Sequence, residues 1–502
     1  FKNMMSFAEF KAFLKKNLLK YFASYPHVYT LIEHSEVIYK VFITDLTPVR
    51  DLLIESYHPR GEKPWDPVCL FRSYWLMCHY GYQGSIPHLQ NPFWAIASGF
   101  TPGDIPGVGT LYDFEKRLLD FDMGQRKKRL QKKHTFNRKP AKKLKKNQKQ
   151  KPKKTGIVKR LADRILREEN KPQPRRADDI LQLIFKECFV LPSHQKGLLG
   201  NKFNLALSGD GMVFETGASH YGIKECDCIK QGIYNCKCKR RFSDPDANWG
   251  WDSYRERYIF GYANYTFTAA NSPHDLPIFS TLAQASRHDS VTHTVSLARM
   301  ISFYPEFNFS KDILDSAHDN YATYELLEHY DIEPFIALNK KNKGNRKYTE
   351  CEITVDENGI PHCKCDHKMT YWGPDNDRRR HKWRCPHVCL KSVNCPFFNR
   401  PEDDYGRTYY TKFEDDIRLF TPTVRDSRKW KNTMKKRTSS ERRNDRVKVD
   451  YQLQGDKVRS KSRWLIRIVM RDAAMHADAW LNNADNSSEE WLSSWFNFAQ
   501  IA

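Results

Sequence analysis

The central part of the chain alternates between short apolar runs and longer segments with a helical period. The first apolar run, residues 204–208, ends in Gly209-Asp210-Gly211. This pattern is typical of a buried strand that presents a carboxylate at its end, with glycines that leave room for a ligand. Further elements are expected downstream, namely strands at residues 258–269, 276–282 and 333–338 and a helix at about 291–303. Strands first, followed by alternating strand and helix, favour an α/β fold with a mixed sheet and helices on its faces.

Both ends of the chain have helical patterns. Residues 1–124 predict helices with aromatic and aliphatic faces, for example at 67–80 and 91–99. A turn at residues 106–109 precedes a capped helix start at Thr110, which is compatible with a helix-turn-helix that contacts DNA. A purely structural helix is an equally good interpretation. Residues 462–471 predict an apolar helix that packs on the core, with a dimer contact as the alternative.

Two further acids stand out after Asp210. Asp315 follows a short strand pattern and precedes a loop and a helix. Glu441 has Arg437 four residues before it and Lys448 seven after it, so a carboxylate and two cations share one helix face. Each acid alone is most simply a loop or surface carboxylate, and a basic helix with one Glu is most often a solvated face. Two acids at strand ends and one on a late helix instead predict a metal site of the ribonuclease H-like kind.

Several segments around these acids resemble a known family. The stretch Leu314-Asp315-Ser-Ala-His-Asp319 and the helix after it are similar to an Asp-x-Gly-Tyr-Asp block, and Arg287-His-Asp289-Ser290 is similar to a Pro-Ala-Asn-x-His-Asp-Ser turn. Arg437, Glu441 and Lys448 keep the spacing of a Tyr-x2-Arg-x3-Glu-x6-Lys signature. These blocks are typical of the DDE transposases of bacterial insertion sequences, and residues 57–72 and 107–118 resemble the helical domain that precedes their ribonuclease H-like core.

The chain departs from the family pattern at two places. Met434 stands at the signature tyrosine, and Ala317-His318 replaces the Gly-Tyr after the second acid. Neither change removes a metal ligand. Both put in question the tyrosine's expected contact with a DNA phosphate.

The resemblance implies an enzyme that hydrolyses a phosphodiester at each transposon end and joins the freed 3′ hydroxyl to target DNA. Asp210, Asp315 and Glu441 would hold two Mg2+ ions, with Mn2+ as a substitute. Arg437 and Lys448 would bind the phosphates of the end. The implied partners are double-stranded DNA, in the terminal inverted repeats and in the target, and a second copy of the chain. The implied location is the bacterial cytoplasm, in association with the nucleoid.

Composition agrees with a polyanionic partner. The 502 residues carry a net charge of +23, which favours nucleic acid or an anionic membrane surface. No apolar run reaches the roughly 18 residues of a membrane span, so a membrane span is excluded. Together with the resemblance above, this makes DNA the expected partner, with no membrane partner. The chain is long enough for two or three domains.

A basic run occupies residues 126–160, with 18 Lys or Arg and no acid in 35 residues. Such a run cannot bury apolar surface, and it predicts a disordered arm that binds DNA phosphates, with a solvated linker as the alternative. Its candidate DNA-binding residues are Arg126, Lys127, Lys128, Arg129, Lys142, Lys143, Lys145 and Lys146.

Ten of the 13 cysteines fall into two clusters. The first cluster is Cys226, Cys228, Cys236 and Cys238, a spacing that suits tetrahedral zinc, with disulfides as the alternative. The second cluster predicts another zinc site, with ligands among Cys363, Cys365, Cys385, Cys389 and Cys395. Its ligand set stays open because Cys351 and four histidines compete for the same four places. The expected cofactors are therefore structural Zn2+, two ions in all, in addition to Mg2+.

The expected organisation follows from these signals. It consists of a helical DNA-binding or dimerisation domain at 1–124, a basic arm at 125–160, a helical connector at 161–200, a catalytic core at 201–460 with Cys-rich insertions at about 218–256 and 340–425, and a helical segment at 461–502. Two other functional classes remain open at this point. A related nuclease without strand transfer would share the three acids, and a domesticated zinc-containing DNA-binding protein would share the cysteines and the arm.

Overall fold

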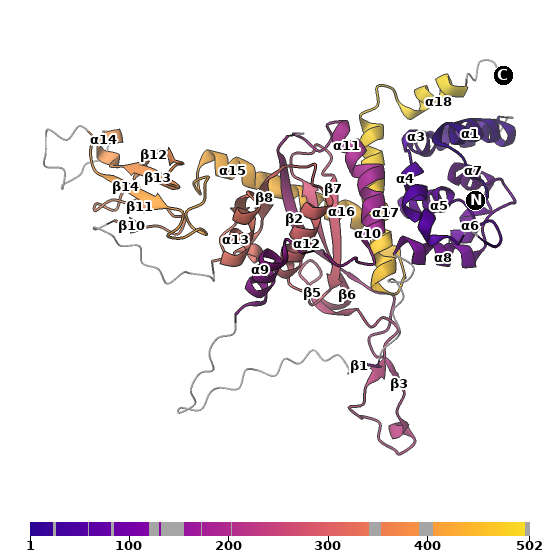
Figure 1. Cartoon of the computed structure of the whole chain (residues 1–502), viewed down its shortest axis with the longest axis horizontal. Coiled ribbons are helices and arrows are strands. Elements are labelled where there is room, and N and C mark those ends of the chain that lie inside the picture. The colour runs from indigo at the N-terminus through magenta and orange to yellow at the C-terminus, as the bar shows by residue number, and fades with distance from the viewer. Residues whose placement is uncertain are drawn as a thin grey trace.

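A computed structural model describes residues 1–23, 27–58, 60–81, 85–119, 130–131, 155–171, 173–201, 203–340, 353–390 and 405–496. Figure 1 shows an elongated molecule with a helical N-terminal region at one end, a mixed sheet in the middle and small sheets at the other end. None of the helices in the described part of the chain combines the length and apolar character that crossing a membrane requires.

The N-terminal region is helical, as its pattern predicts. Ser6 begins the first helix with a capping box, in which its hydroxyl accepts from the amide of Glu9 and the Glu9 carboxylate accepts in return. The fifth helix is buried along its whole length, which explains its almost continuous run of large side chains. The helices are α1 (Phe7–Phe22), α2 (Val28–Glu33), α3 (Ser35–Ile43), α4 (Thr47–Leu53), α5 (Pro67–His79), α6 (Ser85–Leu89), α7 (Pro92–Ser98) and α8 (Val108–Leu118).

The central sheet has six strands and mixed directions. Its strands are β2 (Leu205–Glu215), β5 (Asn248–Asp252), β6 (Arg257–Ala269), β7 (Pro277–Gln284), β8 (Phe309–Leu314) and β9 (Glu333–Ile336). β6 pairs antiparallel with β2, β5 and β7, whereas β8 pairs parallel with β2 and β9. The expected strands at 258–269, 276–282 and 333–338 are confirmed as β6, β7 and β9.

Helices cover the sheet and join it to the N-terminal region. α12 (Asp289–Phe303) packs on β6 and β7, while α16 (Thr438–Lys448) packs on β2 and β6. α17 (Lys461–Asn482) contacts β7 as well as α5 and α3, and one continuous apolar core runs through all of these elements. The remaining helices are α9 (Ile157–Glu168), α10 (Asp179–Phe185), α11 (Leu191–Gln195), α13 (Tyr321–His329), α15 (Arg428–Met434) and α18 (Ser488–Phe496). The fold is thus a mixed α/β fold with a helical N-terminal region.

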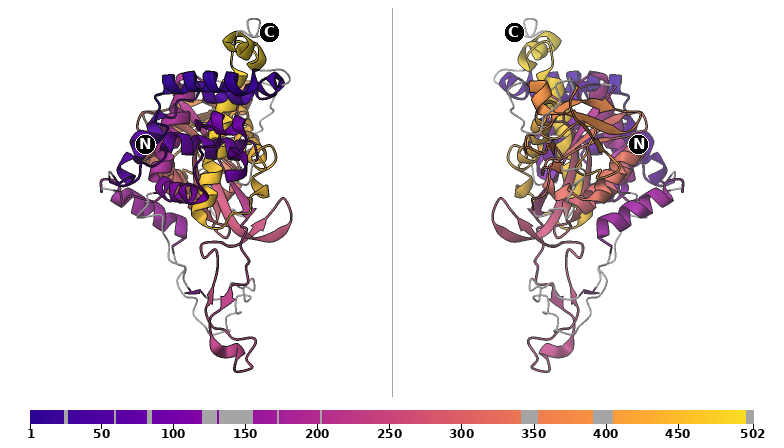
Figure 2. Two further views of the ribbon diagram at one scale, coloured as in Figure 1. Left: turned by 90° about the vertical axis from the view of Figure 1, so that its right-hand side faces the viewer. Right: turned by 90° about the vertical axis from the view of Figure 1, so that its left-hand side faces the viewer.

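Two groups of short strands lie outside the central sheet. β3 (Ile223–Lys224) and β4 (Arg240–Arg241) follow β2, and β4 also pairs with β1 (Leu130–Gln131). Figure 2 shows this three-stranded element projecting away from the body of the molecule. The second group follows β9 and contains β10 (Thr354–Val355), β11 (Pro361–His362), β12 (Thr370–Asp375), β13 (Arg380–Arg384), α14 (Pro386–Leu390) and β14 (Thr408–Lys412).

Candidate functional site

Asp210 and Asp315 come from neighbouring parallel strands. Ser208 of β2 is paired with Ile313 of β8, so the same register continued by two residues sets Asp315 opposite Asp210. Adjacent strands lie about 4.8 Å apart, and residues two apart on a strand share a face. Asp315 has an extended backbone, with φ −79° and ψ 178°, which continues the direction of β8. The two predicted acids are therefore brought together by strand register.

The helix that carries Glu441 lies directly on β2. Small hydroxyl side chains allow this close approach, because Ser208 Oγ lies 2.8 Å from Ser440 Oγ and donates to the Arg437 carbonyl at 2.9 Å. One turn further along α16, Asn444 Nδ2 donates to Asp210 Oδ2 at 2.9 Å. The third predicted acid is thus held above the same strand as the first.

The charges of these acids act on one another. Burial is the main cause that raises the pKa of Asp210 to about 6, and the negative charges of Asp289, Asp315 and Glu441 contribute to the same shift. A carboxyl group that shares a partly buried location with other carboxylates is costly to ionise. Such an arrangement becomes favourable when a cation binds or when protons are retained.

Asp289 is a fourth acid at this location, and it was not among the predicted site residues. It begins α12, and its carboxylate lies against the backbone of β2, since a Cβ added to Gly211 would come within 2.2 Å of Asp289 Oδ1. Burial is again the largest cause that raises the pKa of Asp289. The available sequence signal was the Arg287-His-Asp289-Ser290 turn, which resembles a block of the same family. Gly209 accommodates the hydroxyl of Tyr265, and Gly211 accommodates the carboxylate of Asp289. The expectation that these glycines leave room for a ligand is therefore wrong, because they make room for the protein's own side chains.

His318 holds Asp315 in place. Its Nδ1 lies 2.7 Å from Asp315 Oδ1, and its Nε2 lies 3.0 Å from the hydroxyl of the buried Tyr265. Burial alone would raise the pKa of Asp315, but the hydrogen bond and charge of His318 outweigh it, so that the pKa is lowered. His318 therefore supplies a buried partner for the second predicted acid, Asp315.

A buried ion pair anchors α16 from below. Both Arg443 and Asp472 of α17 are fully buried, and the guanidinium binds the carboxylate through Nε at 3.0 Å and through Nη2. Ser280 of β7 donates to the same carboxylate at 2.6 Å. Losing one partner of such a pair would leave an uncompensated buried charge. The pair thereby fixes the position of α16 relative to α17 and the central sheet.

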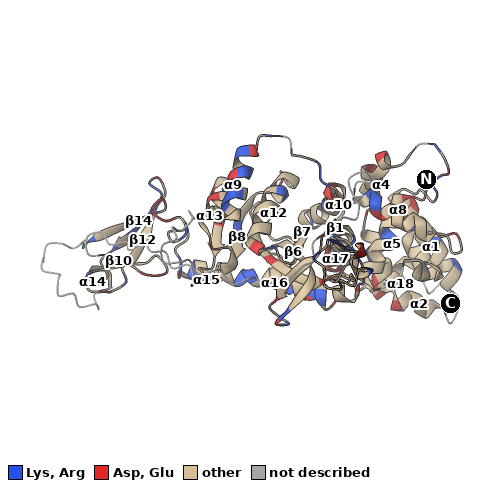
Figure 3. Cartoon of the chain, turned by 90° about the horizontal axis from the view of Figure 1, so that it is seen from below, with Lys and Arg blue, Asp and Glu red and all other residues tan. Residues whose placement is uncertain are grey.

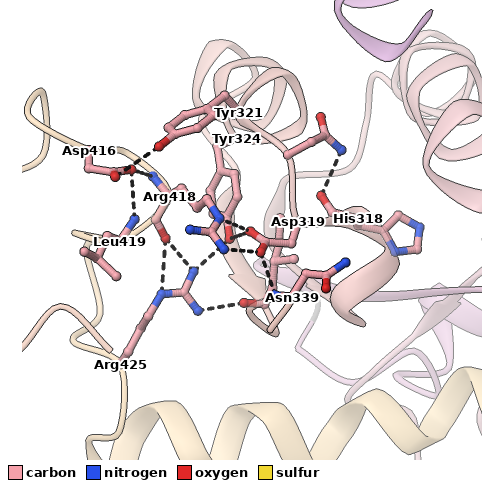
Figure 4. A network of polar contacts seen from close by, with 11 residues as sticks. His318, Asp319, Tyr321, Tyr324, Asn339, Asp416, Arg418, Leu419 and Arg425 are labelled. Carbon is pink, nitrogen blue, oxygen red and sulfur yellow. Dashed lines mark hydrogen bonds and ion pairs between the residues drawn. The ribbon is translucent and has the colours of Figure 1, made fainter. Parts of the chain in front are cut away.

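Asp319, four residues after Asp315, has a structural role. It forms a two-pronged ion pair with Arg418, at 2.6 Å for both contacts, and also accepts from the backbone amide of Asn339 at 2.6 Å. Figure 4 shows how Arg425 and Tyr324 extend this network. The network fastens the segment that returns from β14 to the end of the central sheet.

Two of the predicted DNA-binding residues, Arg437 and Lys448, lie in the described part of the chain. Arg437 lies at the N-terminus of α16 and pairs with Glu441 at 2.8 Å, which confirms the expected helical spacing of these two. Lys448 is the last residue of the helix and is partly exposed. The remaining predicted contacts lie outside the described residues, and they are Arg126, Lys127, Lys128, Arg129, Lys142, Lys143, Lys145 and Lys146.

The first cysteine cluster forms a compact set of ligands. The sulfur atoms of Cys226, Cys228, Cys236 and Cys238 all lie within 4.8 Å of one another, with 3.5 Å between Cys226 and Cys236 and between Cys228 and Cys238. A disulfide would require about 2.0 Å. Tetrahedral zinc, with Zn–S of about 2.3 Å, places its sulfurs about 3.8 Å apart. The set can hold a metal ion such as zinc, and in the described part of the chain it is the one such compact group of His, Cys, Asp or Glu ligands.

The second predicted zinc site stays a prediction. Cys363, Cys365, Cys385 and Cys389 are described but form no compact ligand group with the other described residues, and Cys351 and Cys395 lie outside the described part. Cys363 packs on a small apolar cluster that includes Trp383. The isolated Cys69, Cys78 and Cys188 are buried core residues, as expected.

Comparison with known proteins adds no assignment. No protein-family model matches the chain, and no curated protein matches it.

Proposed function

We propose that the chain is a metal-dependent DNA transposase of the DDE type, with a ribonuclease H-like catalytic core that carries two Cys-rich insertions. One observation carries the proposal. The negative charges of Asp315, at the end of the adjacent strand, and of Glu441, on a late helix, help to raise the pKa of Asp210 at the centre of the sheet. These three acids come from segments that are spread over more than 200 residues of the sequence. This order and placement of acids is what the resemblance to insertion-sequence transposases leads one to expect.

The chemistry of these donors fits Mg2+. All four groups, Asp210, Asp289, Asp315 and Glu441, offer hard carboxylate oxygens, and their mutual repulsion would be relieved by a divalent cation. No three of these carboxylates offer oxygens within 4.8 Å of one another in the structure, so the side chains would have to move toward a bound ion. Bound Mg2+ would activate the attacking water or hydroxyl and stabilise the leaving oxygen of the phosphodiester.

The surrounding side chains have defined tasks in this proposal. Asn444 and His318 orient the carboxylates of Asp210 and Asp315. Arg437 orients Glu441 through its ion pair and presents the rest of its guanidinium to a phosphate. α16 is kept in position by the buried Arg443–Asp472 pair, so the third acid cannot drift from the first two.

Exposed aromatic rings beside the sheet of β12, β13 and β14 support a nucleic-acid partner. Trp372 and Tyr405 are about half exposed, and Lys382 donates to the Tyr405 hydroxyl at 2.6 Å. The guanidinium of the buried Arg384 lies 4.1 Å from the Trp372 ring and 3.8 Å from the Tyr405 ring. Exposed rings with cations beside them are typical of surfaces that stack on bases.

The test uses the DNA that flanks the gene. Duplexes made from this DNA should be cleaved in Mg2+ by the full chain, and a pre-cut end should be joined to a target duplex. Glu441→Gln should abolish both reactions while end binding stays within about tenfold, because a neutral amide is a poor ligand for a hard cation. Glu489→Gln, which changes an exposed acid of α18, is the matched control and should leave both reactions unchanged. Cleavage without joining would identify a nuclease, and binding without either reaction would identify a DNA-binding protein.

A further inference from the structure

A separate pocket of about 650 Å³ lies between α9, the segment after it, α10 and the end of α12. α9 packs against α12 and α13, which gives the pocket a rigid frame. None of the four acids Asp210, Asp289, Asp315 and Glu441 lines it. Its volume is within the range of roughly 300–1,000 Å³ that small-ligand sites occupy.

Part of the charge in this pocket is already neutralised. Arg299 is 9% exposed, and its guanidinium binds Asp178 at 2.9 Å and Asp179 at 2.7 Å. Lys186 is paired with Glu306 at 2.7 Å. The lining acid Glu169 binds His329, also at 2.7 Å. These pairs form the walls of the pocket and leave little charge to attract a ligand.

Two further guanidiniums have no carboxylate partner within the described residues. They belong to Arg164 on α9 and to the half-buried Arg176, which binds Asp179 only through its backbone amide, at 2.7 Å. Glu168 is the lining acid that makes no ion pair in the same part of the chain. Burial lowers the pKa of Arg176, and the positive charges of Arg299 and Arg164 lower it further, against the opposing effect of Asp178 and Asp179. An anion in the pocket would relieve this repulsion. Figure 3 shows α9 beside α12, with much of its ribbon in the colours of Lys, Arg, Asp and Glu.

The rest of the pocket wall is mostly apolar, with Gln173 and Ser302 as polar members. It includes Ile165, Leu183, Val295, Ala298, Ile301 and Phe303. A guanidinium can bind two phosphate oxygens at once, and an apolar wall suits a sugar or base ring.

We propose that this pocket binds a phosphate group carried by a nucleotide-sized unit, with Arg176 and Arg164 as the phosphate ligands. The phosphate belongs either to a free nucleotide or to a DNA strand. The proposal does not depend on cleavage by the four acids.

Calorimetric titration of the full chain with adenosine monophosphate tests the pocket. Wild type should bind this probe, and adenosine, which lacks the phosphate, should bind at least tenfold more weakly. Arg176→Ala should weaken binding of the monophosphate at least tenfold, and Arg176→Lys should restore part of the loss because a point charge remains. Arg167→Ala is the matched control, because Arg167 is an exposed arginine of α9 outside the pocket lining. Equal melting temperatures would show that all variants are folded.

Duplex DNA distinguishes the two sources of phosphate. If the phosphate is that of a DNA strand, Arg176→Ala should weaken duplex binding at least tenfold relative to Arg167→Ala, and duplex should displace the monophosphate. If it is that of a free nucleotide, duplex binding should be unchanged while monophosphate binding is lost. All of these titrations are repeated in the Glu441→Gln background, so that a failure of the cleavage proposal does not affect their outcome. Either of two results overturns the proposal. In the first, the Arg164→Ala, Arg176→Ala double variant binds both the monophosphate and the duplex as wild type does. In the second, wild type does not bind the monophosphate, and the double variant binds the duplex as wild type does.

Discussion

The side-chain amide of Asn444 donates a hydrogen bond to the carboxylate of Asp210, with 2.9 Å between Nδ2 and Oδ2. This contact joins α16 to the central strand β2 three residues after Glu441. The same asparagine accepts from Arg443, whose guanidinium is held by the buried Asp472. The relative position of the first and third acids is therefore set by the buried underside of α16.

Removing the amide should weaken the charged form of Asp210. A hydrogen bond to a charged group contributes about 1.5–3 kcal/mol, so Asn444→Ala should raise the pKa of Asp210 above about 6 by about one unit or more. The acidic limb of the pH–rate profile for Mg2+-dependent cleavage should move to higher pH by a similar amount. Asn483→Ala, an exposed amide on the surface near α17, serves as the control. An acidic limb that does not move would remove Asn444 from the orienting role.

The raised pKa of Asp210 predicts a pH-dependent stability. The folded state keeps a proton on Asp210 up to about pH 6, whereas the unfolded chain loses it near pH 4, so stability falls as pH rises through this window. Asp210→Asn cannot ionise. Its free energy of unfolding relative to wild type should therefore increase by about 1–3 kcal/mol between pH 4 and pH 7 in the absence of divalent cations. Urea unfolding at the two pH values measures the difference, and Mg2+ at pH 7 should reduce it by stabilising only the wild type. A difference in unfolding free energy that does not depend on pH would contradict the raised pKa of Asp210.

Much of the fold was predictable because its strands and helices follow from local patterns of apolar and polar residues in the sequence. The aromatic and β-branched residues at 258–269 predicted β6 to within one residue, and the helical period at 291–303 predicted most of α12. The ion pair between Arg437 and Glu441 followed from a spacing of four on a helix. The local sequence pattern is sufficient to predict a contact when both residues belong to the same helix or strand.

The parts of the site that were missed depend on contacts between distant segments. Asp289 comes from the first turn of α12, and only the packing of that helix on β2 brings it to Gly211. His318 looked like a departure from a family pattern, and its value as a partner for Asp315 appears only once Tyr265 is placed beside it. The second zinc site was left open by its surplus of candidate ligands, two of which, Cys351 and Cys395, lie outside the described residues.

Loss of His318 should destabilise the protein near neutral pH. His318→Ala removes one hydrogen-bond partner from Asp315 and one from the buried Tyr265, at a cost of about 1–3 kcal/mol. The lowered pKa of Asp315 contributes stability above its unfolded pKa of about 3.9, and this contribution is lost as pH falls through the folded value. The deficit of His318→Ala should therefore shrink below about pH 4. Urea unfolding at pH 7 and pH 3.5 measures it, with the exposed His329→Ala as the control.

Zinc content should follow the first cysteine cluster. Protein purified without chelators should contain at least one zinc per chain, and Cys226→Ser with Cys228→Ser should remove one ion by elemental analysis. Cys389→Ser should retain that ion. If wild type contains two zinc ions and Cys389→Ser contains one, the lost ion would establish the second site. Zinc absent from freshly purified wild type would contradict both assignments.

The central claim is that Asp210, Asp289, Asp315 and Glu441 together hold divalent cations, and iron-directed cleavage of the protein tests it without knowledge of the DNA sequence. Fe2+ replaces Mg2+ in the full chain, ascorbate and peroxide generate hydroxyl radicals at the bound ion, and mass spectrometry locates the backbone breaks. The account predicts breaks close to all four acids, suppression of these breaks by excess Mg2+, and their loss in Asp210→Asn and Asp315→Asn but not in the exposed control Asp163→Asn. Breaks that are absent from these four positions in wild type, or that persist unchanged in both site variants, would contradict it.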